Sequence, residues 1–573
     1  MKMNELQMNE EEPKNLLSHK TNCYPDSEEI SRFPRLLYRI HEKPPFYLSI
    51  MLGFQHYLTM FGSTMGMPLI LAPIVCFDNE PVVIVSVMST TFFCSGIVTL
   101  LQTSIGCRLP IVQGGTYTFV ASIMAIMASK GDCPSKMNAN FNMTSNMTNT
   151  DPEWKLRMRE VQGAIIVASF LQIFIGLSGI IGYVLKYIGP LTIAPTICLV
   201  ALPLYSTAGY YAGSQWFVAM LTMFCIILFS QVLKKYSLPL CKTRIHIFEL
   251  FPVLFAMIVG WILSYILTAT GLLKKDSPAR TDYRSNVFAH TEWFRVPYPG
   301  QWGAPSISAA AVFGMLSGVL ASMVESIGDY YACARMSDAP PPPNHAINRG
   351  LLVEGIGCVI TGIWGTGNGT TSYSENIGAI GITRVASVTV IQCGAVIMIL
   401  LSVIGKFGAI FASIPHPVIG GMFIIMFGMV FAFGISSLQF VDLNSMRNLC
   451  VLGCSFYFGM ALPSWVKVHG HSINIGVEWL NQVIRVLLMT NMAVGGLTGF
   501  VLDNLLPGTS QERGIIKWQN NLMPDGHPVT ISSIHVYDPP FLTMKFMTSK
   551  VCKYIPFLPY YGDQNLLEQD EGL

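Results

Sequence analysis

The chain has 573 residues, of which 35 are Lys or Arg and 33 are Asp or Glu. Charged residues make up 12% of the chain, compared with about 25% in a typical soluble protein. Hydrophobic residues make up 51%, and the mean hydropathy is +0.48. These values exclude an ordinary soluble enzyme and a disordered protein, and a net charge of only +2 argues against a nucleic-acid binder. The composition predicts an all-α polytopic membrane protein.

Polar segments at the two ends enclose a long apolar region. Residues 1–45 lack the apolar core of a signal peptide, so we expect a flexible cytosolic tail there and a second cytosolic tail over residues 506–573. Between them, twelve apolar runs approach the ~20 residues that a membrane-spanning helix needs. These runs are residues 47–74, 82–104, 162–182, 186–206, 214–233, 248–270, 305–328, 350–366, 388–411, 417–435, 446–463 and 482–503.

Two further apolar stretches, residues 109–129 and 365–383, contain Pro, Gly and Ser/Thr clusters that cannot hold a regular helix. Counting both gives fourteen crossings, and each broken stretch is third in a set of seven. Because seven is odd, the second set enters the membrane from the opposite side, which indicates an inverted repeat with binding where the broken helices meet. We therefore expect repeats over 46–270 and 305–505, joined by an extracellular loop over 271–304. The alternative is that both stretches are glycine-rich loops or packing helices.

The orientation follows from two sequons and from the basic residues. Asn142 and Asn146 each begin a glycosylation sequon in the loop after the third crossing, which predicts that this loop is extracellular and that both tails are cytosolic. Most basic loops then face the cytosol, as is usual for membrane proteins. Loop 271–304 is also basic but would be extracellular, so it does not conform to this rule. Cys76 and Cys133 both fall on the predicted outer side, where a disulfide and two free thiols are equally open.

Charged side chains within predicted spans point to a binding site, because burying a charge in a membrane is costly. Glu325 and Asp329 are four residues apart, so one helix face carries both carboxylates. Two close acids repel each other unless one is protonated or a cation lies nearby, which suits a cation-coupled site. The alternative for Asp329 is a capping role at the end of its span.

The second broken stretch offers a different pattern. Glu375 and Asn376 lie at the start of a predicted half-helix, whose free N–H groups can donate to carbonyl oxygens. The Glu375 carboxylate can accept N–H groups. Together they complement a lactam edge, N–H beside C=O, such as a nucleobase carries. The competing reading of Glu375 is a helix cap without a ligand.

The first broken stretch and the first span supply further polar residues. Gln113, Thr116 and Tyr117 occupy the corresponding place in the first broken stretch, and an aromatic ring there can stack on a planar ligand. Gln55 and His56 lie in the first span, where a lone His more often forms hydrogen bonds between helices than carries protons.

Several classes of chemistry lack a signal in the chain. The 14 cysteines show neither CxxC pairs nor Cys/His ligand spacing, so no metal site is indicated. No phosphate-binding loop of the type GxxxxGK[ST] occurs, which argues against an ATP-driven pump. We find no nucleophile–base pairing, so we predict neither an enzyme nor a cofactor.

Three motifs resemble those of the nucleobase–ascorbate transporter family (solute carrier family 23). They are Gln55–Leu58 (QHYL), Glu325–Tyr330 (ESIGDY) and Glu375–Arg384 (ENIGAIGITR). The last matches the family signature of an acid or Gln, then Asn, any residue, Gly, four residues, Thr and a basic residue. The resemblance covers roughly residues 45–540, and Ala332–Arg349 is similar to the animal branch.

The resemblance implies a fold and a site. The fold has fourteen crossings in two inverted repeats, short strands in the third and tenth crossings, a core domain from crossings 1–4 and 8–11, a gate domain from the others, and often a homodimer. Carried over by motif position, Glu325 and Glu375 hold the cargo and Tyr117 stacks on it. Asp329, Asn376, Thr383 and Arg384 take supporting positions.

Glu375 decides the expected cargo. The family's ascorbate carriers have proline at this position, and ascorbate has no N–H for a carboxylate to accept. The chain is therefore expected to import nucleobases of the uracil, thymine, hypoxanthine and guanine type across the plasma membrane, with Na⁺ as the coupling ion. The alternatives are Na⁺-dependent ascorbate transport, proton-coupled nucleobase, xanthine or urate transport, and a receptor that has lost transport.

Overall fold

The computed structural model describes residues 36–131, 133, 151–184, 187–233, 236, 238–240, 243–245, 248, 251–284, 286–522, 535–540, 542 and 547–561. Within these residues, nine helices are long and apolar enough to cross a membrane, or ten if the bent pair at Thr490 counts as one span. Three shorter apolar helices accompany them, over Tyr117–Ala128, Trp216–Val232 and Val388–Val403.

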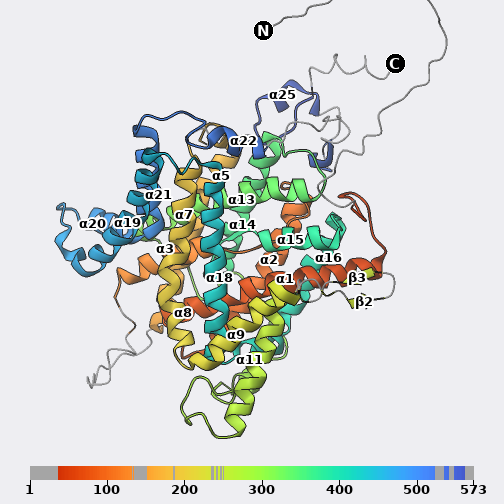
Figure 1. The fold of residues 1–573 in the computed structure, drawn as a ribbon, viewed down its shortest axis with the longest axis vertical. Helices are drawn as coiled ribbons and strands as arrows, with labels where there is room; N and C mark the ends of the chain where they lie inside the picture. Colours follow the sequence, from red (N-terminus) through yellow and green to blue (C-terminus); the bar gives the residue numbers. More distant parts are fainter. Residues whose placement is uncertain are drawn as a thin grey trace, which may run out of the picture. The chain divides into compact units, whose positions relative to one another are not determined.

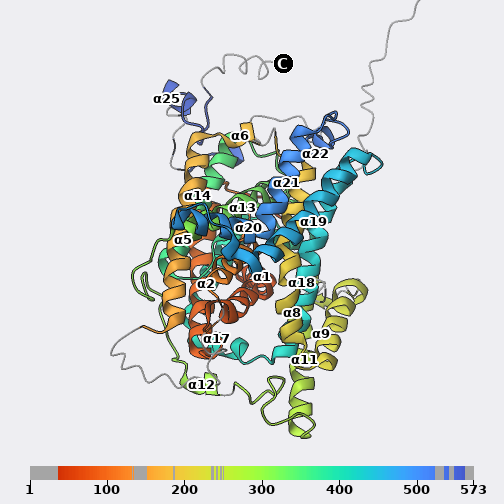
Figure 2. The same cartoon turned by 90° about the vertical axis from the view of Figure 1, so that its left-hand side faces the viewer.

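Most helices pack into two bundles (Figures 1 and 2). The first bundle consists of α1 (Phe46–Val75), α2 (Pro81–Ser104), α3 (Tyr117–Ala128), α5 (Glu153–Ser178), α13 (Ala309–Met336), α14 (Asn344–Trp364), α15 (Ser374–Thr383) and α16 (Val388–Val403). The second bundle consists of α7 (Pro190–Ala201), α8 (Tyr205–Ala212), α9 (Trp216–Ile227), α11 (Pro252–Ala269), α18 (His416–Ser436), α19 (Met446–His469) and α21 (Asn491–Leu505).

Shorter elements connect and cap these helices. They are α6 (Ile181–Val184), η1 (Leu202–Leu204), the π-helix η2 (Leu228–Val232), α12 (Asn286–His290), α17 (Gly405–Ala412), η4 (Ser437–Phe440), η5 (Gly470–Ser472), α20 (Glu478–Met489), α22 (Ile515–Leu522), η6 (His535–Tyr537) and α25 (Lys550–Lys553). Four short strands form two antiparallel pairs: β1 (Gln113–Gly115) with β4 (Thr370–Ser372), and β2 (Leu238–Leu240) with β3 (Thr243–Ile245).

The two short strands implied by the family resemblance are present, and they pair with each other. Gln113 lies opposite Ser372, and Gly115 lies opposite Thr370. Each strand is followed at once by a helix, α3 after β1 and α15 after β4. The two broken stretches, far apart in sequence, therefore meet inside the first bundle.

Among the predicted straight spans, the following three are broken or change helix type in the structure. The run 482–503 is α20 and α21, which meet at Thr490 with a bend of 80°. The run 388–411 is split between α16 and α17, because the loop before α13 takes over the hydrogen bonds at the break: Arg295 N donates to Val403 O at 2.9 Å and Gly405 N donates to Trp293 O at 3.0 Å. The run 214–233 changes from α-helix to π-helix at Leu228.

Parts of both predicted tails pack against the first bundle. Residues 36–42 run beside residues 384–388, with hydrogen bonds from Leu37 N to Arg384 O at 2.8 Å and from Ala386 N to Tyr38 O at 2.9 Å. From the other end of the chain, Tyr537 is fully buried, and the Arg349 guanidinium donates to its carbonyl oxygen. These described segments differ from the flexible tails that the composition predicts, because each supplies apolar side chains to the bundle.

A disulfide joins Cys76, directly after α1, to Cys133, after α3. Sequence reasoning left this pairing open. Replacing Cys76 with Ser is expected to lower the free energy of unfolding by about 2–5 kcal/mol, because the bond restricts the unfolded chain. The melting temperature of the detergent-solubilised protein measures the effect. Cys454→Ser, which removes an exposed free thiol, is the control, and equal melting temperatures for the two variants would contradict the expectation.

Candidate functional site

The centre of the site is the middle of α13. Glu325 is half-buried and Asp329 is buried one turn further on, so the predicted carboxylate pair lies on one face of a continuous helix. Because α13 extends to Met336, Asp329 is inside the helix rather than at its end. The Asp329 Oδ2 atom is buried and has no hydrogen-bond partner among the described residues.

The paired strands bring two helix starts next to α13. Tyr373, between β4 and α15, donates from its hydroxyl to the Gly115 carbonyl oxygen at 2.8 Å and lies 3.0 Å from Thr64 Oγ1 of α1. Gln113 Nε2 donates to Ser372 Oγ at 2.9 Å and is fully buried. The structure therefore places Gln113 within the β1–β4 pair, where its side chain joins the two strands. We call this strand pair the strand crossing.

Each of the two predicted binding acids accepts a hydrogen bond from a hydroxyl group in the first half of the chain. Thr116 Oγ1 donates to Glu325 Oε2 at 3.2 Å, and Ser63 Oγ donates to Glu375 Oε1 at 2.8 Å. Glu325 lies on α13 and Glu375 at the start of α15, two helices that pack against each other. Neither remaining carboxylate oxygen receives a hydrogen bond from the described residues, so each can accept one from a ligand.

An aromatic cluster begins directly after Thr116, the residue that is bonded to Glu325. Tyr117, the first residue of α3, is 8% exposed, and its ring meets that of Phe427 edge to face at 5.5 Å between centroids. Phe427 stacks in turn on Phe423, and both belong to α18 of the second bundle. Tyr117 therefore lies where the two bundles meet, beside Glu375.

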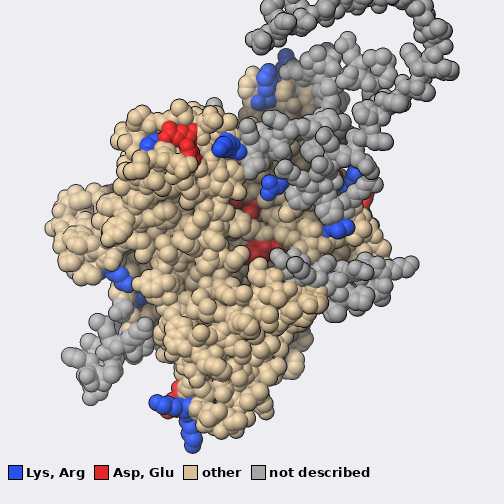
Figure 3. All heavy atoms as spheres, in the orientation of Figure 1, with Lys and Arg blue, Asp and Glu red and all other residues tan. Residues whose placement is uncertain are grey.

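One face of α15 is exposed, beginning at Glu375. Glu375, Gly378 and Gly381 are exposed, as is Gly328 on α13. No atom lies within 4 Å of a Cβ built on Gly328 or Gly378. In the space-filling view of Figure 3, the middle of the face is largely uncharged, and acidic side chains are visible there between the tan surfaces. These exposed positions of α15 are spaced so that they lie on one side of the helix.

The remaining predicted residues lie around this centre rather than in it. Asn376 is fully buried, and its Nδ2 atom donates to His56 O at 2.8 Å and lies 3.2 Å from His56 Nδ1. Gln55 is buried next to His56, with its Nε2 atom unpartnered among the described residues. His56 and Asn376 thus connect α1 to α15.

Thr383 and Arg384 end α15, about 14 Å from Glu375 by the rise of the helix. Thr383 Oγ1 donates to Ala379 O within the helix, and Arg384 adopts a left-handed backbone conformation that ends it. Both residues lie away from the acids. Asn142 and Asn146 fall outside the described residues.

Sequence reasoning missed a fourth acid, Glu354 of α14. Its side chain is fully buried and accepts hydrogen bonds from Ser326 Oγ at 2.5 Å and from the Tyr330 hydroxyl at 2.7 Å. Tyr330 also accepts from Gln102 Nε2 at 2.7 Å. Glu354 thus lies behind α13, one layer from Glu325, with both oxygens bonded to protein. The sequence signal that could have identified Glu354 was its position as a charged residue inside the apolar run 350–366.

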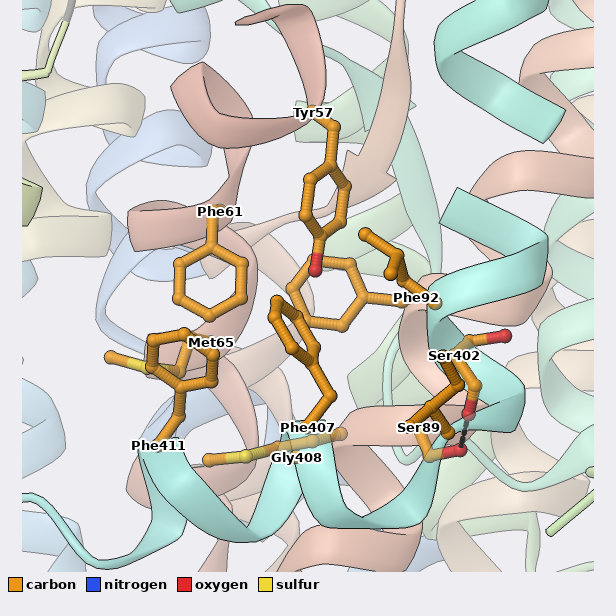
Figure 4. A pocket seen from close by; sticks show the side chains of 12 residues that line it. Tyr57, Phe61, Met65, Ser89, Phe92, Ser402, Phe407, Gly408 and Phe411 are labelled. Atoms are coloured by element: carbon orange, nitrogen blue, oxygen red, sulfur yellow. Dashed lines mark hydrogen bonds between the residues drawn. The ribbon is translucent and has the colours of Figure 1, made fainter. Parts of the chain in front are cut away.

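A separate pocket lies between α1, α2 and α17 (Figure 4). It is lined mainly by aromatic side chains, among them Tyr57, Phe61, Phe92, Phe407 and Phe411. Its volume of about 10 Å³ leaves room for no more than one water-sized group, and its lining has no charged side chain. The pocket is a packing gap rather than a cargo site. Among the described residues, no group of three or more His, Cys, Asp or Glu side chains could hold a metal ion.

Comparison with known proteins gives matches over most of the chain. A Permease family model (Xan_ur_permease) matches residues 48–468. Solute carrier family 23 member 2 of Homo sapiens is 47% identical over 541 residues, covering 92% of this chain and 83% of the relative. Solute carrier family 23 member 1 of Rattus norvegicus is 46% identical, with 92% and 89% covered. Nucleobase-ascorbate transporter 2 of Arabidopsis thaliana is 35% identical, with 86% and 93% covered.

Among solved structures, murine Solute Carrier 26 family member A9, an anion transporter in the inward-facing state, is similar in fold. The TM-score is 0.52 at 13% sequence identity, and the match covers 77% of this chain and 69% of the other. At this identity the likeness concerns the fold alone.

Proposed function

Because the chain belongs to the nucleobase–ascorbate transporter family, which includes solute carrier family 23, we propose that it imports nucleobases together with a cation. It is a multi-pass membrane permease rather than an enzyme. The proposed cargo is a base of the uracil, thymine, hypoxanthine or guanine type, and the proposed location is the plasma membrane.

The observation that carries this proposal is the pair of acids at the strand crossing. Glu325 and Glu375 each have one oxygen held by a protein hydroxyl and one oxygen left for a ligand. A flat ring with N–H beside C=O can donate to these free oxygens. The N-terminus of α15 has no side-chain cap, so its N–H groups can donate to the ring carbonyl. Tyr117 offers an aromatic face to the same ring.

The two bundles suggest how cargo would move. We assign the first bundle as the core domain, because it carries both acids, and the second as the gate domain, which reaches the site through Phe427. Alternating access would move core against gate around the fixed site, in a fold of fourteen crossings arranged as two inverted repeats. The homodimer implied by the family resemblance stays a prediction.

One observation supports the orientation with both tails in the cytosol. Disulfides form in oxidising compartments, so the side that carries Cys76 and Cys133 is assigned to the outside.

For the coupling ion we propose Na⁺, with Asp329 as the principal ligand. Its buried Oδ2 atom has no hydrogen-bond partner among the described residues, and Na⁺ is bound by oxygen ligands of this kind. A proton taken up by Glu325 or Asp329 is the alternative, because either would relieve the repulsion among these acids.

Ascorbate is the second candidate cargo, since the name of the Arabidopsis relative joins it with nucleobases. Glu375 favours the nucleobase. Ascorbate has no N–H to donate to a carboxylate at this position, where the family resemblance implies proline in ascorbate carriers.

Uptake by cells that express the chain tests the proposal. Radiolabelled uracil, hypoxanthine and ascorbate are supplied in Na⁺ medium and in choline medium at fixed pH. We expect uptake of at least one base in Na⁺ medium and its loss in choline. Ascorbate uptake without base uptake would overturn the cargo, and undiminished base uptake in choline would overturn Na⁺ coupling.

A further inference from the structure

Ser63 of α1 makes an unusual hydrogen bond for a serine inside a helix. Buried hydroxyls in helices commonly donate to the carbonyl oxygen four residues back. Thr59, Thr90 and Ser455 do so here, at 3.0, 2.7 and 2.6 Å. Ser63 instead donates across the bundle to Glu375 Oε1 at 2.8 Å, although it is only 5% exposed.

This bond limits the orientation of Glu375. The glutamate side chain has several rotatable bonds, and α15 leaves it exposed on the open side of the helix. The hydrogen bond from Ser63 to Oε1 restricts the rotation of the carboxylate and leaves Oε2 free to accept a hydrogen bond from a ligand. Fixing a rotamer-rich side chain before the ligand arrives reduces the ordering cost of binding.

The two residues beside this pair have different partners. Thr64 approaches the Tyr373 hydroxyl, which supports the strand crossing, and Asn376 donates to His56. Only Ser63, among the described residues of α1, donates a hydrogen bond to a carboxylate of the site.

We propose that Ser63 is a positioning residue, which holds the Glu375 carboxylate so that Oε2 faces the N–H group of the cargo. The inference rests on the proposed function, since it assigns Ser63 a part in nucleobase recognition. It predicts an effect on affinity rather than on the amount of folded protein.

Uptake kinetics of Ser63→Ala provide the first test. We expect the KM for the transported base to rise about 10-fold, because a hydrogen bond to a charged group is lost. The maximal rate per transporter at the cell surface should change less than about 2-fold. Ser63→Thr keeps the hydroxyl and should restore the KM. Ser455→Ala is the matched control, a buried serine bonded to its own helix, and should leave the KM unchanged.

A variant cycle with Glu375 separates positioning from direct contact with cargo. In the Glu375→Gln background, Ser63→Ala should raise the KM no further, because the carboxylate that Ser63 holds is absent. Independent, multiplying effects of the two substitutions would overturn the proposal. So would a fall in maximal rate with an unchanged KM.

A measurement without cargo keeps the inference distinct from the proposed function. The purified full-length protein is treated with a hydrophobic carbodiimide, and modification of Glu375 is followed by mass spectrometry. In Ser63→Ala, Glu375 should be modified faster, because its carboxyl group is no longer held. Equal rates in wild type and variant would refute the positioning role even if nucleobases are transported. Faster modification with no nucleobase uptake by wild type would refute the cargo assignment alone.

Discussion

Glu375→Gln is expected to reduce nucleobase uptake, measured as Vmax/KM, by about 10- to 100-fold. The substitution keeps the size of the side chain and replaces a charged acceptor with a neutral one, and hydrogen bonds to charged groups contribute about 1.5–3 kcal/mol. Glu375 is exposed and bonded through one oxygen to Ser63, so the folded protein does not depend on its charge. Surface biotinylation should therefore show an unchanged amount of transporter.

Glu478→Gln is the control for this variant. Glu478 is also exposed at the start of a helix, α20, and its described partner is Gln482. Its uptake should equal that of wild type. If Glu375→Gln transports nucleobase as well as Glu478→Gln at equal surface expression, Glu375 does not bind the cargo.

Gly114→Ala is expected to reduce uptake by about 10-fold or more, because the added methyl group disturbs the strand crossing. A Cβ on Gly114 would lie 2.6 Å from Tyr373 Cζ and 2.8 Å from its Cε2 atom, so the ring must move. The Tyr373 hydroxyl holds the Gly115 carbonyl oxygen and contacts Thr64. Displacing this ring shifts the starts of α3 and α15, and a displacement of about 1 Å at a site can cost about 100-fold.

Gly453→Ala is the matched substitution, because no atom lies within 4 Å of a Cβ on this glycine of α19. Alanine is the better helix former, so this variant should melt at the same or a higher temperature and transport normally. Gly114→Ala should melt lower than wild type. Normal uptake and melting of Gly114→Ala would mean that the crossing tolerates movement of Tyr373.

The broken stretches were predictable from the sequence because their chemistry is incompatible with a membrane helix. Pro110, Gly114 and Gly115 interrupt one stretch, and Gly365 and Gly367 the other. Both resolve into a strand and a short helix, since paired strands satisfy the backbone groups that a helix cannot. Glu325 and Asp329 were found because charges within apolar runs are rare.

Other features depend on tertiary contacts that no local pattern carries. Ser63 looks like any small residue of an apolar helix, and its partner is 312 residues away. The break after Val403 arises from hydrogen bonds with the loop at Trp293 and Arg295, whose sequence is remote from it. The 80° bend at Thr490 also falls within a run that is uniformly apolar enough to pass as one span.

The packing of the chain's two ends has a consequence for biogenesis. Ile40 and Tyr537 share one apolar cluster with Ile327, Ile347 and Ile377 of the first bundle. Tyr537 leaves the ribosome after every helix of that bundle has been synthesised, so the cluster stays incompletely covered until residue 537 has been made. Exposed apolar surface of this kind recruits chaperones and favours aggregation. A chain that stops before Tyr537 therefore leaves part of this apolar cluster uncovered.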